Sequence, residues 1–262
     1  MIFRLLLPFF MTLSLFGAEN AWYSKIDTKI EAGIYLPSSS GTISNIVGES
    51  NFKDDFGYSN TEATYLALNL LLDYDYVPNL NINYFNMQDN QSATLTKTLK
   101  VADGTFSSNV ATVIDYQVFS VIIYQDLKLK GKMTSWFGKS FYSGDMEFDI
   151  GLNTKLIKWN YEVQDLSDTT KSPSWIHVSE FIPLPYIGMK YYLYNLIMYA
   201  DASALAFSSA KSTSYQVGLD YRVVGGLYLS AAYMYEQFKV LEQQDTVDFK
   251  TAGYKFSFKY AF

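Results

Sequence analysis

Cysteine is absent from this chain of 262 residues, and histidine occurs only once. The lack of cysteine excludes disulfide bonds, thiol nucleophiles, thiolate metal sites and lipid attachment through a cysteine. Beyond the N-terminal segment, no run of 18 apolar residues occurs, so the sequence predicts no transmembrane helix there. The formal net charge of −6 argues against a nucleic-acid-binding protein.

The N-terminal segment, MIFRLLLPFFMTLSLFGA, has a single charge at Arg4, a large apolar run and small residues at Gly17 and Ala18. This pattern is typical of a secretory signal peptide. We therefore expect a signal peptide over residues 1–18 and a single domain over residues 19–262. An exported chain with no transmembrane helix after its signal peptide is expected in the periplasm, outside the cell, or in the outer membrane as a β-barrel.

Aromatic residues are abundant, with 23 Tyr and 19 Phe, or 18% of the chain with Trp included. Tyrosine suits surfaces that are apolar at one end and wet at the other, as at a membrane interface. This composition fits an outer-membrane barrel and also many extracellular β proteins.

Hydrophobic residues alternate with polar ones along most of the mature chain, which predicts β-strands. We expect an all-β fold: a closed antiparallel transmembrane up-and-down barrel of about ten strands, with eight as the alternative. The expected strands lie at residues 25–36, 61–76, 80–85, 111–125, from 146, after 185, 196–208, 215–223, 227–240 and 253–262.

The expected connections alternate in length. Short turns are predicted at Val77-Pro78-Asn79, Tyr194-Asn195 and Gly225-Gly226, whereas long loops are predicted at 37–60, 87–110 and 163–177. Outer-membrane barrels have short periplasmic turns and long external loops. Only the connection over residues 126–145 departs from this alternation.

Period-two patterning alone does not distinguish a membrane barrel from a soluble one, which would turn its leucines inward. The apolar faces carry tyrosines near the strand ends, at Tyr74, Tyr76, Tyr84, Tyr124 and Tyr221, as aromatic girdles do. In the fourth strand we assign Ile114, Tyr116, Val118, Ile122 and Tyr124 to the lipid-facing side. The opposite faces carry charges of both signs, which we expect to line the lumen: Lys29, Glu31, Asp73, Asp115, Asp149, Lys155, Lys190, Asp201, Asp220, Arg222, Lys255 and Lys259.

The segment GYKFSFKYAF places Gly253 before alternating aromatic residues at Tyr254, Phe256, Phe258, Tyr260 and Phe262. It resembles the last strand of Gram-negative outer-membrane β-barrel proteins, where this pattern is the signal recognised by the barrel-assembly machinery. The segments NFKDDFGYSN, VPNLNINYF, EFDIGL and DFKTAGYKFSFKYAF further resemble a family of small, largely uncharacterised outer-membrane barrels. The resemblance implies the fold and an outer-membrane location, and it implies no activity.

Catalytic residues are sparse. His177 and Ser179 are the candidates for a rim enzyme that acts on lipids, but Glu180 points to the opposite face of the same strand, so the third member of a triad would have to come from another strand. Asp54, Asp55, Asp165 and Asp168 are rim acids of the kind that omptin-type proteases need. No phosphate-binding loop, metal-spaced cluster or cofactor motif occurs, so we expect neither cofactor nor metal.

The sequence thus favours a monomeric outer-membrane barrel, structural or surface-exposed, with at most a narrow pore. A small-solute channel is the first alternative, and a rim lipid hydrolase or protease is the second. The expected partners are outer-membrane lipid, lipopolysaccharide and the barrel-assembly machinery.

Overall fold

The computed structural model describes residues 26–45, 48–72, 77–96, 98–102, 104–136, 139–142, 144–168, 170–206, 210–242 and 245–262. The predicted signal peptide, Asp73, Tyr74 and Tyr76 lie outside these residues. Within the described part of the chain, no helix is long and apolar enough to cross a membrane.

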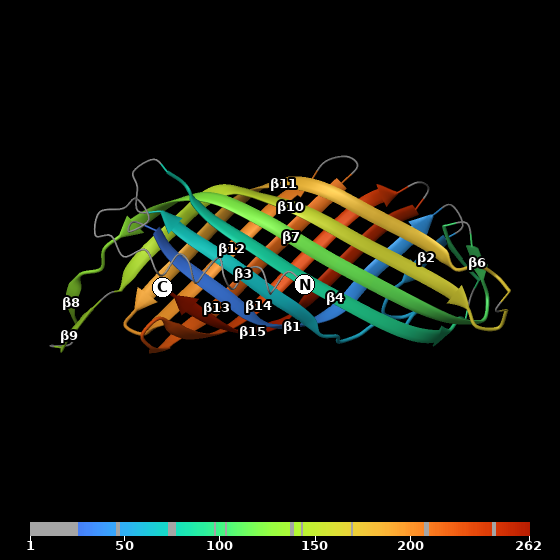
Figure 1. Ribbon diagram of the computed structural model, residues 1–262, viewed down its shortest axis with the longest axis horizontal. Helices are drawn as coiled ribbons and strands as arrows, with labels where there is room; N and C mark the ends of the chain where they lie inside the picture. Colours follow the sequence, from blue (N-terminus) through green and yellow to red (C-terminus); the bar gives the residue numbers. More distant parts are fainter. Residues whose placement is uncertain are drawn as a thin grey trace, which may run out of the picture.

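The described residues form one antiparallel sheet that closes on itself (Figure 1). Ten strands follow one another around the ring, and the last of them, β15, pairs with β1 over sixteen residue pairs. The predicted ten-stranded barrel is therefore confirmed. The ring consists of β1 (Ile26–Asn45), β3 (Ala63–Leu72), β4 (Asn79–Thr94), β7 (Asn109–Leu129), β10 (Asp145–Asp165), β11 (Ser174–Leu193), β12 (Leu196–Ala206), β13 (Ala210–Val224), β14 (Leu227–Glu242) and β15 (Asp245–Ala261).

Short strands lie at the two ends of the ring. At one end, β2 (Gly48–Asn51) pairs with β1, and β5 (Leu99–Val101) pairs with β6 (Gly104–Phe106). At the other end, β8 (Met133–Trp136) and β9 (Lys139–Tyr142) form a hairpin inside the connection that the sequence marks as irregular. The predicted turns at Tyr194-Asn195 and Gly225-Gly226 are confirmed at this second end. Gly225 supplies a positive φ of 53°, which favours glycine.

The two halves of the barrel wall differ in which face is apolar. We call the half that ends at the connections after β3, β7, β11 and β13 the turn half, and the other the loop half. The outer face of the turn half is a largely apolar band; on β7 it runs from Phe119 to Leu129, with Gln125 as its polar position. At about 3.3 Å per residue and a strand tilt of about 40°, this band is about 25 Å high, the height of a hydrocarbon core in outer-membrane barrels.

In the loop half, the outer face is polar and the interior is filled by apolar side chains. Outward residues include Ser40 on β1, Gln88 on β4, Asn160 on β10 and Lys239 on β14. Inward residues form one buried cluster with Trp159, Tyr161, Phe238 and Phe249 at its centre. The loop half is thus built like a soluble barrel, with its core inside.

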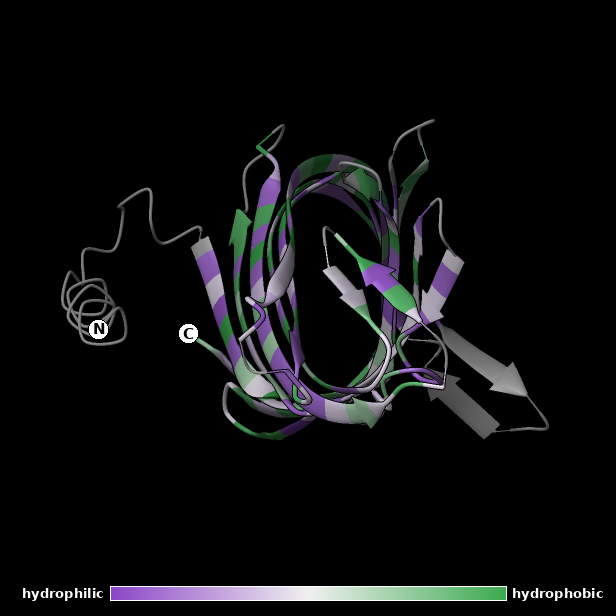
Figure 2. Ribbon diagram, turned by 90° about the vertical axis from the view of Figure 1, so that its right-hand side faces the viewer, coloured by the Kyte–Doolittle hydropathy of each residue, from purple (hydrophilic) through white to green (hydrophobic). Residues whose placement is uncertain are grey.

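The switch between the two halves follows one cross-strand row. Leu66, Tyr84, Phe119, Leu156 and Phe181 are direct neighbours in register across β3, β4, β7, β10 and β11, and all point outward. The row above it is Asn86, Gln117, Lys158 and Ser179 on β4, β7, β10 and β11. Figure 2, an end-on view from the side of β2 and β6, shows hydrophilic and hydrophobic residues alternating along the strands of the barrel wall.

The face assigned to the fourth predicted strand is wrong. On β7, the structure places Ile114, Tyr116, Val118, Ile122 and Tyr124 inside, all at most 6% exposed. The outward positions of the turn half are instead Phe119, Ile123 and Leu127. Both faces of this strand carry large apolar residues, because its inner face contributes to the loop-half core and its outer face to the band. Period-two patterning could not separate them.

The strands are longer than predicted. β1, β4 and β10 continue to Asn45, Thr94 and Asp165, through residues expected to be loops. β11 includes Pro183 and Pro185, where the sequence argues against a central strand. Both prolines point outward, beyond the end of the pairing between β11 and β12 at Tyr186 and Ser203. Their missing N–H groups therefore cost no ladder hydrogen bonds on that side.

Candidate functional site

The interior of the turn half collects nine of the twelve charged residues predicted for the lumen. The structure places them on six strands that surround a common polar interior. They are Lys29, Glu31, Asp149, Lys155, Lys190, Asp201, Asp220, Lys255 and Lys259.

The first charged cluster joins β1, β13 and β15. Glu31 forms an ion pair with Lys255 at 2.7 Å and lies 3.5 Å from Lys259, while the Ser257 hydroxyl donates to it at 2.5 Å. Lys259 also contacts Asp220 at 2.9 Å. Glu31 and Lys259 are direct neighbours across the closing seam, and Lys255 lies four residues away along β15, opposite Tyr35. The seam of the barrel is therefore fastened by buried ion pairs.

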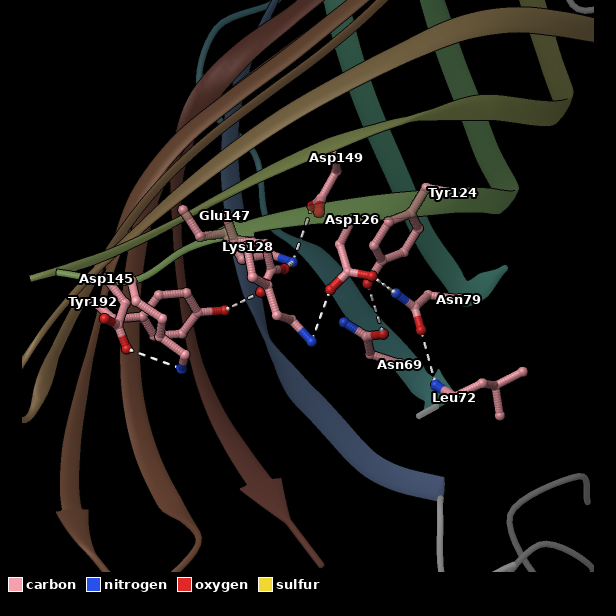
Figure 3. A network of polar contacts seen from close by, with 12 residues as sticks. Asn69, Leu72, Asn79, Tyr124, Asp126, Lys128, Asp145, Glu147, Asp149 and Tyr192 are labelled. Carbon is pink, nitrogen blue, oxygen red and sulfur yellow. Dashed lines mark hydrogen bonds and ion pairs between the residues drawn. The ribbon is translucent and has the colours of Figure 1, made fainter. Parts of the chain in front are cut away.

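The second cluster lies near the turns and joins β10 with β11 (Figure 3). Lys190 contacts Glu147 at 2.5 Å and Asp149 at 2.9 Å, and the Tyr192 hydroxyl donates to Glu147 at 3.0 Å. Beside it, Asp126 accepts from Asn79 at 3.0 Å and from Lys128 at 2.8 Å. Glu147 was missed by the sequence analysis, although it precedes Asp149 by two positions and shares its face.

A third pair lies deepest, against the loop-half core. Lys155 on β10 contacts both carboxylate oxygens of Glu236 on β14, at 2.6 and 2.7 Å. The two strands lie across the barrel from each other in the strand order, so this pair spans the interior. The sequence predicted Lys155 but not its partner, because β14 carries apolar residues on both faces and neither face could be assigned.

Aromatic rings complete the environment of the lysines. The Lys255 Nζ lies 4.0 Å from the centroid of the Tyr65 ring, and the Lys259 Nζ lies 4.5 Å from that of Tyr199. Such contacts stabilise a desolvated ammonium group. Most of the buried charges are thus paired, and two of the lysines also lie over aromatic rings.

Two cavities remain between these groups. The larger, about 140 Å³, is bordered by Lys29, Asp201 and Asp220, and the smaller, about 50 Å³, by Lys155, Glu236 and again Asp201. The space exists because β3 and β4 present Ala67, Asn69, Asn81 and Asn83 inward, where the opposite strands present Lys, Glu and Tyr. Both cavities are polar and large enough for water.

The smaller cavity ends against the aromatic core. Phe85, Val118 and Met234 border it on that side. Beyond them Phe85 contacts Tyr35 and Tyr116, with ring centroids 5.8 and 5.1 Å apart. The polar interior is therefore a blind recess whose inner end is closed by rings.

A segment after β2 adds to this closure. Phe52, Phe56 and Tyr58 are completely buried in the loop half, where the Phe52 ring lies 5.8 Å from Trp159 and 5.5 Å from Tyr161. The Tyr58 hydroxyl donates to Thr112 at 2.8 Å. The sequence predicts a long polar loop here, and this prediction is wrong for these residues; the signal for a buried segment is three aromatic residues within seven positions.

Three predicted lumen residues are not in the lumen of the described structure. Asp115 points outward from the loop half of β7, where it accepts from Gln117 at 3.3 Å. Arg222 is exposed at the β13–β14 turn and donates to the Gly225 carbonyl at 2.6 Å. It lies so close to the turn that the barrel wall no longer encloses it. Asp73 lies outside the described residues.

The candidate rim enzyme is not assembled. His177 and Ser179 point outward from β11, and the His177 Nδ1 contacts the Asn160 side-chain oxygen on β10. Glu180 lies on the opposite face, as expected. The row that contains His177 holds Asn160 and Asp115 in register, so an amide separates the ring from the nearest carboxylate of that row.

Three of the four predicted rim acids, Asp55, Asp165 and Asp168, serve local structure. Asp165 accepts from the Ser167 backbone N–H at 2.9 Å and from Lys171 at 3.1 Å, and these contacts hold its pKa below the usual range. The Thr170 hydroxyl donates to Asp168 at 2.6 Å and lowers the pKa of that carboxyl in the same way. Asp55 accepts from the Asn51 backbone N–H at 2.7 Å, within the turn that carries the plug. No group of three or more His, Asp or Glu side chains in the described ranges is placed to hold a metal ion.

Comparison with known proteins gives a match in solved structures alone. No family model matches the chain, and no curated protein sequence matches it. The chain is similar to the translocator domain of autotransporter NalP from Neisseria meningitidis, with 11% identity over 96% of this chain and 92% of that chain, and a TM-score of 0.46.

Two further solved structures are similar to the chain. Outer membrane protease OmpT from Escherichia coli has 10% identity, 89% and 97% coverage and a TM-score of 0.48. Neisserial surface protein A has 10% identity, 91% and 97% coverage and a TM-score of 0.34. Because identities are 11% or lower and TM-scores lie under 0.5, the assignment of this chain rests on its own geometry.

Proposed function

We propose that this protein is a monomeric outer-membrane β-barrel, closed to solutes, that holds its loop half outside the membrane as a structural or surface-exposed element. The inversion of polarity at the row from Leu66 to Phe181 carries the proposal. An apolar band about 25 Å high around a charged interior suits lipid outside and ion pairs inside. In the loop half, a polar outer wall around an aromatic core suits surroundings of water.

Closure is supported by the two kinds of filling. Lys155 and Glu236 pair across the turn half, and Trp159, Tyr161 and Phe249 fill the loop half above them. A solute would have to displace both. The cavities support the channel alternative for only part of the interior, because the recess ends at Phe85 and Val118.

Heat-modifiable migration on gels and fractionation with outer membranes test the location. We expect a folded band that migrates differently from the boiled sample, in the membrane fraction. A soluble protein with a single band would refute the membrane assignment.

Planar-bilayer recording tests closure. We expect no discrete conductance steps from the wild-type protein. Steps whose size changes in Lys155→Met would support the channel alternative instead. For the enzyme alternative, we expect His177→Ala to leave lipid composition and proteolysis unchanged. The proposed assembly signal at Gly253 and Tyr254 to Phe262 remains a prediction that truncation at Tyr260 would test by loss of the folded band.

A further inference from the structure

The outer faces of β13, β14 and β15 carry two features that the proposed function does not use. Just beyond the apolar band they bear three lysines, Lys211, Lys239 and Lys250. Within the band, the same strands form an apolar groove around Ala231. Together they have the layout of a lipid: a charged end and an acyl chain.

Each of the three lysines lies four residues from a tyrosine on its own strand, and we call Tyr215, Tyr233, Tyr235 and Tyr254 the tyrosine belt. Lys211 precedes Tyr215 by four residues, Lys239 follows Tyr235 by four, and Lys250 precedes Tyr254 by four. Because the strands are antiparallel, each lysine lies on the loop-half side of its tyrosine, by about 13 Å along the strand and about 10 Å in height. That is headgroup distance from the edge of the hydrocarbon.

The tyrosines of this belt pack against one another. The rings of Tyr215 and Tyr235 stack with centroids 4.9 Å apart, and those of Tyr233 and Tyr254 meet edge to face at 5.7 Å. Aromatic rings at this position mark the membrane–water interface. They place the lysines on its wet side.

The lysines are arranged unfavourably for each other. Lys211 is directly opposite Lys239 in the antiparallel pairing of β13 and β14. Like charges directly opposite each other destabilise a sheet. Asp248, the residue opposite Lys239 on β15, offsets one of these charges, and it also lies 3.8 Å from Lys250. An anion with more than one negative charge would relieve the remainder.

The groove lies below the belt on the same strands. Ala231 is opposite Leu219 on one side and Phe256 on the other, and both neighbours are nearly half exposed. The small side chain leaves a groove of about 610 Å³, walled by Leu229, Phe258 and Ile34 as well. This volume lies within the ~300–1,000 Å³ of small-molecule sites.

The other side of the barrel offers no such pair of features. On β7 and β10 the outer face of the loop half carries Lys158 with Asp115 and Glu162, so acids outnumber lysines there. Charge complementarity therefore singles out β13 to β15.

We propose that the outer face of β13, β14 and β15 binds a phosphorylated lipid, with a phosphomonoester on Lys211, Lys239 and Lys250 and an acyl chain in the groove at Ala231. The inference rests on the membrane location proposed above and adds a specific lipid site to it. A phosphomonoester carries about −1.5 to −2 charges, which matches the cluster better than the single charge of a phosphodiester.

The test is lipid retention by the folded barrel in detergent, measured by native mass spectrometry with lipid A that bears two phosphomonoesters. We expect the triple variant Lys211→Gln, Lys239→Gln, Lys250→Gln to bind at least about tenfold more weakly than the wild type. Ala231→Leu, which fills the groove, should weaken binding of the same probe by a smaller factor. Lys158→Gln and Ala200→Leu, outward residues on β10 and β12, are the matched controls and should bind as the wild type does.

Dephosphorylated lipid A and phosphatidylglycerol complete the design. Both should bind the wild type weakly, with no further loss in the triple variant. Equal binding of lipid A by the wild type and the triple variant would overturn the site, as would binding of phosphatidylglycerol as tight as that of lipid A. If Ala231→Leu weakens the binding of lipid A and the triple lysine variant does not, the assignment of the phosphate to the lysines is overturned. Each variant must keep heat-modifiable migration; if the wild type lacks it, the membrane proposal itself fails.

Discussion

The turn half and the loop half share the same ten strands and yet place their apolar residues on opposite faces. On β10, Leu152 points out and Lys155 in, whereas ten residues along the strand Glu162 points out and Trp159 and Tyr161 point in. The backbone is the same regular ladder throughout. The surroundings, lipid or water, thus account for the polarity of each half, and ion pairs and aromatic packing are two ways of filling one kind of cylinder.

The loop half should lose most from the removal of a single core side chain. Trp159→Ala deletes a fully buried ring that packs against Phe52, Tyr161 and Phe249, and we expect a loss of about 4 kcal/mol in the free energy of unfolding. Urea unfolding in lipid vesicles, followed by the folded band, measures it. The outward neighbour Lys158→Ala should change stability by less than about 0.5 kcal/mol. Equal effects would mean that the loop half has no packed core.

The turn half should respond to unbalanced charge rather than to lost volume. Glu236→Leu leaves Lys155 buried without its carboxylate, and we expect a loss of about 3 kcal/mol. The double variant Lys155→Met with Glu236→Leu should recover most of it, because an apolar pair of similar size replaces the ion pair. The same urea titration decides; a double variant no more stable than the single one would contradict a purely structural role for the pair.

The outer faces provide the sharpest contrast between the halves. Leu152→Lys puts a charge in the middle of the apolar band on β10 and should cost about 2 kcal/mol in a bilayer. Glu162→Lys, on the same strand in the loop half, should cost close to nothing. Unfolding both variants in lipid vesicles compares their free energies of unfolding. Similar losses would mean that both positions face lipid or both face water.

The smallest expected effect concerns pH. Asp89 is buried in the loop half beyond the boundary row, where desolvation raises the pKa of its carboxyl and Gln91 donates to it at 2.8 Å. A raised pKa in the folded state means that the charged form costs stability above the unfolded pKa of about 3.9. Asp89→Asn should therefore raise the unfolding midpoint slightly at pH 7. The gain should vanish below about pH 4, where the carboxyl is protonated in both states; a gain that persists there would point to another cause.

Much of the turn half was predictable from the sequence. Its strands alternate leucine or aromatic residues with lysine and acids, as β1 and β15 do, so Lys29, Glu31, Lys255 and Lys259 could be assigned to the inner face. In a membrane barrel, this alternation allows only one assignment, with the apolar face toward lipid and the charged face toward the interior. The closing turns at Tyr194-Asn195 and Gly225-Gly226 contain asparagine and glycine, which favour turns, and Gly225 has a positive φ.

The loop half was not predictable in the same way. Its strands alternate serine, asparagine and lysine with apolar residues. A polar loop with scattered hydrophobic residues has the same sequence pattern. For this reason β1 and β4 were cut short, and Phe52, Phe56 and Tyr58 were assigned to solvent. On β7, where both faces are apolar, the phase of the alternation depended on partners in β10 and β4 that a single strand does not reveal.

The two prolines of β11 bear on how this wall behaves next to another molecule. From Ser174 to Pro185, β11 pairs with β10 on one side and extends past the end of its pairing with β12 on the other. A free strand edge is a template on which a second chain can add a strand. Pro183 and Pro185 have no backbone N–H, so this edge offers an added strand two fewer hydrogen-bond donors. This edge of β11, which no described strand pairs beyond Tyr186, is thus protected against edge-to-edge association.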